Sequence, residues 1–210
     1  MKILIKTLII ITILSCLCNY VQAQETKTHS KIISFTPQYM IKRGLMMNID
    51  TKLNNNKWFQ ISPQIYLANN ENYNGGDNYN ELIGFGIDFH RKIIVNNIPK
   101  MLTFKGISEL GIYLSYGPSY NFFYLNYFDD DEYNSAQYHT NIHKLGGDVM
   151  IGYQFFIKKI LSIDIYTGLG IRYSFIESEG EQESLFSDSY IGFGYTGNLM
   201  LLGIRFGLSL

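Results

Sequence analysis

Apolar and polar residues alternate along most of this chain with a period of two. Between residues 57 and 68, Phe59, Ile61 and Ile65 share one phase, while Gln60 and Gln64 share the other. Successive side chains of a β-strand point to opposite faces, whereas a helix repeats every 3.6 residues. The same alternation returns in segment after segment as far as the C-terminus, so the chain is predicted to be all-β.

Breaks in the alternation divide the chain into eight predicted strands. The strands cover residues 31–41, 44–53, 57–68, 81–95, 102–125, 140–157, 160–177 and 190–209. Short connections alternate with long polar ones at 69–80, 128–139 and 178–189. A change of phase near Gly197 and Asn198 predicts a β-bulge in the last strand. An even number of antiparallel strands with this rhythm of connections is typical of an up-and-down transmembrane β-barrel.

Alternation alone does not say which face points outward, because a soluble barrel of the lipocalin type alternates as well. The interior of an eight-stranded barrel is only just wide enough for side chains. We therefore expect the face that carries Phe, Ile, Leu and Tyr to point outward to lipid. The opposite face is rich in glycine, for example Gly84, Gly86 and Gly168, and glycine on a solvated outer face would only weaken the strands. We predict an eight-stranded antiparallel up-and-down transmembrane β-barrel over residues 31–210.

The polar face then encloses a nearly balanced set of charges. Desolvated charges have to be paired, so we predict a network of salt bridges that fills and closes the lumen. A path for protons or ions through the same groups is the alternative. The predicted lumen network comprises Asp50, Lys52, Asp88, His90, Lys92, Lys105, Glu109, Lys144, Asp148, Asp164, Arg172 and Arg205.

The N-terminus reads as a secretory signal over residues 1–23. Lys2 and Lys6 precede an apolar run, and a small-residue site ends at Ala23. A rival lipoprotein signal would leave a lipidated Cys16. Cleavage after Ala23 removes both cysteines and leaves residues 24–30 as a short periplasmic segment before the barrel. It also lowers the formal net charge from -1 to -3, because residues 1–23 contain two lysines and no acid.

Composition supports this interpretation and excludes others. Charged residues make up 17% of the chain, against about 25% in a typical soluble domain. The mean hydropathy of -0.03 is too low for a bundle of membrane-spanning helices. The nearly neutral charge provides no basic surface, so no nucleic-acid partner is expected.

Three segments resemble small outer-membrane β-barrel proteins of Bacteroidota, with an architecture similar to the OmpA/OmpX type. They are the signal ending at 21–24, the strand at 58–66 and the closing segment at 202–210. The resemblance implies an outer-membrane location in a Gram-negative bacterium and contact with membrane lipid and lipopolysaccharide. It also implies insertion by the barrel-assembly machinery, which usually reads a terminal aromatic residue. Here Leu210 is last and Phe206 lies four residues earlier.

Tyrosine and phenylalanine gather near the predicted strand ends, at 116–128 and 173–195. Such clusters are typical of the aromatic girdle at a membrane interface. A surface on which carbohydrate stacks is the functional alternative.

Candidate chemistry outside the lumen is sparse. Nucleophilic hydrolysis needs a serine, a histidine and an acid in contact, and no serine is well placed beside His139 or His143. The acidic run Asp129, Asp130, Asp131 and Glu132 is a weak candidate for a divalent cation, since it lacks the spaced ligands and turn glycine of a calcium loop. We expect no cofactor.

The expected function is structural, or an interaction through the surface loops, with the partner unknown. The alternatives are an outer-leaflet lipid-modifying enzyme, such as a lipid A deacylase or acyltransferase, and a narrow conduit for small solutes.

Overall fold

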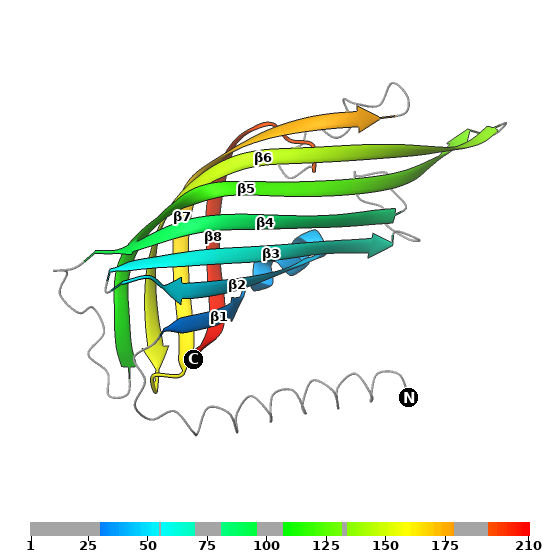
Figure 1. The fold of residues 1–210 in the computed structure, drawn as a ribbon. Coiled ribbons are helices and arrows are strands. Elements are labelled where there is room, and N and C mark those ends of the chain that lie inside the picture. The colour runs from blue at the N-terminus through cyan, green and yellow to red at the C-terminus, as the bar shows by residue number, and fades with distance from the viewer. Residues whose placement is uncertain (1–29, 55, 70–80, 96–106, 132–133, 179–192) are drawn as a thin grey trace, which may run out of the picture.

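The chain forms a closed barrel of eight antiparallel strands in which each strand pairs with its sequence neighbours and β8 returns to β1 (Figure 1). A computed structural model describes residues 30–54, 56–69, 81–95, 107–131, 134–178 and 193–210. The strands are β1 (Lys31–Phe35), β2 (Gly44–Lys52), β3 (Lys57–Asn69), β4 (Glu81–Ile94), β5 (Ile107–Asp131), β6 (Asn134–Ile157), β7 (Leu161–Ser178) and β8 (Gly197–Ser209). The predicted all-β, up-and-down barrel of eight strands is confirmed.

The two ends of the barrel differ. At one end, here called the turn end, β2 leads to β3, β4 to β5 and β6 to β7, and the C-terminus lies close by. At the opposite end, here called the loop end, β3 leads to β4, β5 to β6 and β7 to β8. The hairpin of β5 and β6 extends well beyond the other strands at the loop end (Figure 1).

The predicted first strand is too long. After Phe35 the chain leaves the sheet and forms a 3-10 helix, η1 (Pro37–Lys42), before β2 begins. Proline lacks the N–H that a strand ladder needs, and its fixed φ suits the first position of a helix. Arg43 ends the helix in a left-handed conformation with φ of 56°.

The structure differs from the sequence prediction at one loop and at one β-bulge. The expected loop over 128–139 is largely strand, because β5 continues to Asp131 and β6 begins at Asn134. The expected bulge at Gly197 is wrong, since β7 and β8 pair without interruption from Arg172–Gly197 onward. The phase changes there because β8 begins at Gly197. The register shift lies in β5 instead, between Glu109 and Gly111, where Gly111 has φ of +105°.

The narrow interior holds more bulky apolar side chains than expected, since the described inward positions include Trp58, Phe123 and Tyr113. Cross-strand pairing with glycine makes the room. Tyr113 is paired with Gly152 and Phe123 with Gly84, and a Cβ atom on either glycine would collide with the facing ring.

The same arrangement serves the polar side chains. Arg172 lies across from Gly146, and Asp148 lies across from Gly170. The glycines of the inner face are therefore part of a complementary packing pattern, in which Tyr113, Phe123, Arg172 and Asp148 each cover a glycine on a neighbouring strand.

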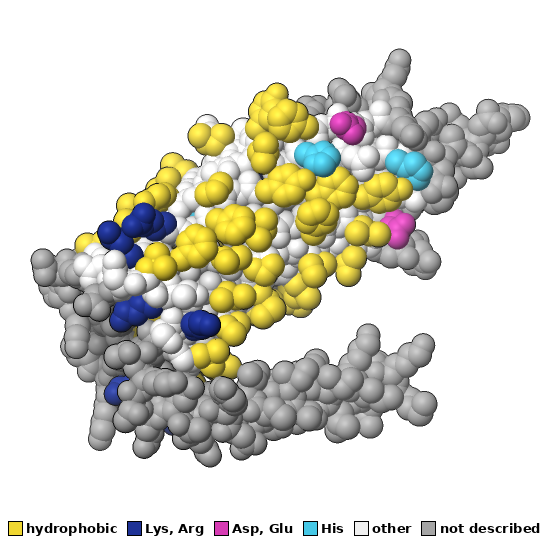
Figure 2. All heavy atoms as spheres, in the orientation of Figure 1, with side chains coloured by type: hydrophobic (Ala, Val, Ile, Leu, Met, Phe, Trp, Pro, Cys, Tyr) yellow, Lys and Arg dark blue, Asp and Glu magenta, His cyan; other side chains and the backbone are white. Residues whose placement is uncertain are grey.

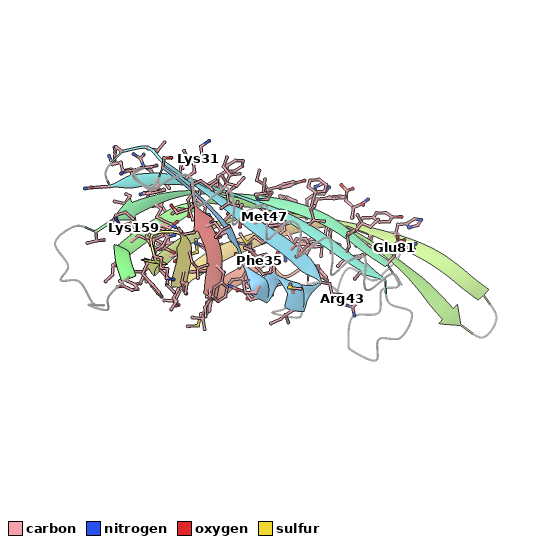
Figure 3. All side chains as sticks on the ribbon, turned by 90° about the horizontal axis from the view of Figure 1, so that it is seen from below. Lys31, Phe35, Arg43, Met47, Glu81 and Lys159 are labelled. Atoms are coloured by element: carbon pink, nitrogen blue, oxygen red, sulfur yellow. The ribbon has the colours of Figure 1, made fainter. Side chains whose placement is uncertain are left out.

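A short seam closes the barrel. β1 and β8 pair over only four positions, from Ile32–Ser209 to Phe35–Phe206. Beyond Phe35, η1 takes the place of the missing strand. The side-chain amide of Gln38 is oriented so that both its nitrogen and its oxygen have a partner on Ile204. The nitrogen donates to the carbonyl oxygen of Ile204 (3.0 Å), and the oxygen accepts from the N–H of Ile204 (3.2 Å). Figure 3 shows η1 between Phe35 and Arg43, beside β8.

We expect Gln38→Leu to destabilise the closed barrel by about 2 kcal/mol, since both backbone groups of Ile204 lose their partner. Urea unfolding of the protein refolded in detergent measures the change. Met40→Leu is the matched control, because Met40 lies on the same helix with its side chain 60% exposed. Equal stability of the two variants would contradict the role of Gln38.

Candidate functional site

The lumen is the candidate site that brings most of the chemistry-bearing side chains together. Near the turn end lies a group that we call the turn-side cluster, formed by Asp50, Lys92, Asp164 and Arg205. The Lys92 ammonium is 3.2 Å from Asp50 Oδ2 and 3.4 Å from Asp164 Oδ2, and Arg205 Nη1 is 3.1 Å from the same Asp164 oxygen. All four side chains are at most 2% exposed. Two carboxylates and two cations thus share one desolvated space with their charges balanced.

Neutral groups add further contacts to the turn-side cluster, although Asp50 Oδ1 and Arg205 Nε are buried without a hydrogen-bond partner among the described residues. Tyr113 donates a hydrogen bond of 2.7 Å to Asp164 Oδ1, and Lys92 donates one of 3.2 Å to Gln154 Oε1. The Lys92 ammonium also lies 4.3 Å from the centre of the Tyr113 ring. These contacts matter because a buried ion pair is stable only when its remaining donors and acceptors are also satisfied.

A second group, here called the loop-side cluster, lies further along the lumen. Arg172 forms a two-pronged contact with Asp148, with Nη1–Oδ1 of 2.7 Å and Nη2–Oδ2 of 3.0 Å. His90 Nε2 lies 3.6 Å from Asp148 Oδ2. Asp88 is buried as well, but no ion pair joins it to another described residue. The contact between Arg172 and Asp148 is the strongest of these, because a planar guanidinium that donates two parallel hydrogen bonds to one carboxylate combines charge with fixed geometry.

Apolar clusters lie on both sides of the charged region. At the loop end the lumen is filled by Tyr66, Leu82, Phe123, Leu125 and Ile142, and Tyr39 of η1 packs against them. A second cluster packs around the turn-side charges through Tyr113, Met150 and Tyr166 and continues to the turn end with Ile32, Trp58, Ile94 and Phe156. The described side chains therefore bury the charges between two apolar layers.

The remaining residues of the predicted lumen network lie apart from these clusters or outside the description. Lys52 is half-buried near the end of β2, and the ammonium of half-buried Lys144 lies 5.7 Å from the ring centre of Phe123. Lys105 lies outside the described residues. Glu109 lies in β5 at the register shift, and its side chain is not described.

Sequence reasoning missed several polar partners. Tyr113, Gln154 and Gln38 take part in the lumen contacts, yet none is charged. Tyr113 has the inward phase of β5, so the period of two contained a signal for it. The role of Gln38 had no such signal, because it depends on η1 leaving the sheet.

The histidines outside the lumen do not form a hydrolytic site with the described residues. His143 Nδ1 is 2.9 Å from the Tyr120 hydroxyl, and His139 Nδ1 is 2.7 Å from the Tyr124 hydroxyl. Asp129, Asp130 and Asp131 lie at the end of β5, where side chains are not described, and Glu132 lies outside the description. In the described part of the chain, no three acidic, histidine or cysteine side chains are arranged to hold a metal ion. Nor is any helix there long and apolar enough to cross a membrane.

Comparison with protein-family models, curated proteins and solved structures found no match to this chain. The function of the chain therefore has to be inferred from its own geometry.

We expect Lys92→Met to lower the free energy of unfolding by about 3–5 kcal/mol, because it leaves the buried Asp50 carboxylate without its cation. Adding Asp50→Asn removes the stranded charge and restores part of the loss. Urea unfolding of the two variants in detergent measures this coupling. Lys159→Met, at an exposed turn position, is the control and leaves stability unchanged. A double variant no more stable than Lys92→Met alone would show that Asp50 does not depend on Lys92.

Proposed function

We propose that this protein is an integral β-barrel of a Gram-negative outer membrane, acting as a structural or interaction protein with a closed lumen. The observation that supports this most strongly is that the barrel encloses its charged side chains and exposes apolar ones on its outer face. Its charged residues Asp50, Lys92, Asp164 and Arg205 are buried. Leu202, Leu169 and Ile171 on the outer face are 74%, 67% and 65% exposed. A soluble protein would place these groups the other way round.

The apolar outer surface forms a band with charged groups at both ends. Figure 2 shows hydrophobic side chains over the middle of the barrel, with lysine and arginine gathered toward the turn end and acidic residues and histidines toward the loop end. Exposed basic residues near the turn end are Lys31, Arg91, Lys158 and Lys159, and exposed acidic residues near the loop end are Glu81 and Glu177. Figure 3 places Lys159 and Glu81 toward opposite ends. An apolar band between two polar rims is the expected outer surface of a membrane barrel.

The N-terminal signal favours export, which would place the turn end in the periplasm and the loop end at the cell surface. In this orientation the extended β5–β6 hairpin projects outward. Lipopolysaccharide is then the lipid partner at the loop end, and insertion depends on the barrel-assembly machinery.

The apolar layers on both sides of the lumen charges favour a structural or interaction role over a solute conduit. Water and ions would have to cross Leu82, Phe123 and Leu125 at one end and Trp58 and Phe156 at the other. Each of these side chains is at most 4% exposed.

We expect Ile151→Arg to impair refolding into phospholipid vesicles, at a cost of about 2–4 kcal/mol, because it places a charge on the lipid-facing band. Leu53→Arg, just beyond the end of β2, is the control. Ile151 and Leu53 are similarly exposed, at 52% and 58%. Heat-modifiable gel mobility reports the folded barrel. Equal tolerance of both arginines, or no heat-modifiable form of the unchanged protein, would refute the membrane proposal.

The closed lumen makes a second prediction. In planar bilayers the refolded protein is expected to produce no steady single-channel conductance. The double variant Leu82→Ala and Phe123→Ala thins the apolar layer at the loop end and serves as the comparison. Conductance through the unchanged protein would favour the conduit instead.

A further inference from the structure

The outer face of β4–β7 near the loop end carries an ordered surface of aromatic, histidine and acidic side chains. Strand register places these side chains in cross-strand rows. One row contains Phe85, Phe122, His143 and Phe175; the next contains Ile83, Tyr124, Asn141 and Glu177; the third contains Glu81, Asn126 and His139. We call these three rows the rim surface.

Polarity rises from row to row along the strands. The row before the rim surface, formed by Ile87, Tyr120, Leu145 and Tyr173, has no ionisable group other than tyrosine. The first rim row introduces one histidine among three phenylalanines. The third row is wholly polar. A lipid-facing surface that changes in this way passes from hydrocarbon to headgroups over about two rows.

Both histidines of the rim surface are held by tyrosine hydroxyls. The Tyr120 hydroxyl is 2.9 Å from His143 Nδ1, and the Tyr124 hydroxyl is 2.7 Å from His139 Nδ1. Ring packing fixes both imidazoles further. His143 lies 4.9 Å from the Phe122 ring, and His139 stacks on Tyr124 with ring centres 5.5 Å apart.

These contacts occupy Nδ1 of both histidines, so Nε2 is the ring nitrogen turned away from the tyrosine. When the tyrosine O–H donates to Nδ1, the imidazole proton resides on Nε2. Nε2–H is then a hydrogen-bond donor that Tyr120 or Tyr124 does not use. The same donor remains when the imidazole is protonated. In that tautomer, and in the protonated imidazole, the two Nε2–H groups are donors on an outer face, each beside an aromatic ring. They then suit a ligand with anionic oxygens and an apolar or sugar body.

Glu81 and Glu177 face the same surface and are exposed. Their charges would repel a bare anion, so the ligand has to bring a counter-charge. Phosphate groups accompanied by a divalent cation satisfy both kinds of side chain, since the phosphate accepts from the histidines and the cation draws the carboxylates.

We propose that the rim surface binds the phosphate groups of outer-leaflet glycolipid through His139 and His143, with divalent cations bridging the phosphates to Glu177 on β7 and to Glu81 on β4. This proposal rests on the proposed membrane location and names the lipid chemistry that the loop end recognises. It also gives the two histidines a role at the level where the outer face changes from apolar to polar.

The experiment measures binding of bisphosphorylated lipid A to the full-length mature barrel in a nonionic detergent with millimolar Mg²⁺ in every arm. Lipid A stripped of both phosphates is the second probe. The variants are His139→Gln with His143→Gln, and Tyr120→Phe with Tyr124→Phe. Tyr173→Phe is the matched control, because Tyr173 is 56% exposed on the neighbouring strand, outside the two tyrosine–histidine pairs.

We expect the unchanged protein to bind the bisphosphorylated lipid at least 10-fold more tightly than the stripped lipid. The double histidine variant should lose most of this preference, the double tyrosine variant part of it and Tyr173→Phe none. Equal binding of the two lipids by the unchanged protein would overturn the proposal in favour of a sugar-stacking surface. An unaltered preference in the double histidine variant would also overturn it.

Folding in detergent is checked first by heat-modifiable mobility. Failure there, or equal tolerance of arginine at Ile151 and Leu53 in vesicles, would refute the membrane barrel itself. A folded barrel that inserts into vesicles but lacks phosphate preference would refute only the rim surface proposal.

Discussion

The small volume inside an eight-stranded barrel constrains every other feature of this protein. Side chains must fill that volume without voids and without collisions. The chain meets this requirement by pairing large inward residues with glycine across the strands, as with Tyr113 and Gly152 or Arg172 and Gly146. A Cβ atom on either glycine would displace the facing side chain. The glycine content and the lumen contacts therefore arise from one geometric condition.

The same narrowness determines how charge is handled. Lys92 lies close enough to both Asp50 and Asp164 to be shared, and Arg205 adds a second cation to Asp164. Such a group is stable only when its remaining donors and acceptors are met, which Tyr113 and Gln154 help to do. With apolar layers on both sides, these charges are shielded from solvent.

Closure of the barrel depends on a local departure from the sheet. Thr36 and Pro37 end β1 after five residues, so the β1–β8 contact is short. The side-chain amide of Gln38 forms the two hydrogen bonds to the backbone of Ile204 that the next residue of a longer β1 would have formed. The seam therefore combines a four-position backbone ladder with the side chain of Gln38, which continues it at Ile204.

By itself, the sequence determined the fold class, the number of strands and the approximate limits of most of them. The period of two and the polar connections are local properties of the chain, and strand register follows from them once one face is buried. The lumen positions of Asp50, Asp88, His90, Lys92, Asp148, Asp164, Arg172 and Arg205 have the phase that the alternation predicts.

Only the tertiary structure decided which charges meet, because partners such as Lys92 and Asp164 are 72 residues apart and are joined by the curvature of the closed sheet. It also decided that η1 replaces the end of the first strand, and that β5 and β6 continue through a polar segment. In the hairpin, the ladder between β5 and β6 outweighs the polar local pattern. At η1, Pro37 ends the strand and Gln38 holds the helix against β8. The pairing of Tyr120 with His143 and of Tyr124 with His139 was decided in the same way, since a two-residue period records the face of a side chain but not its neighbour across the sheet.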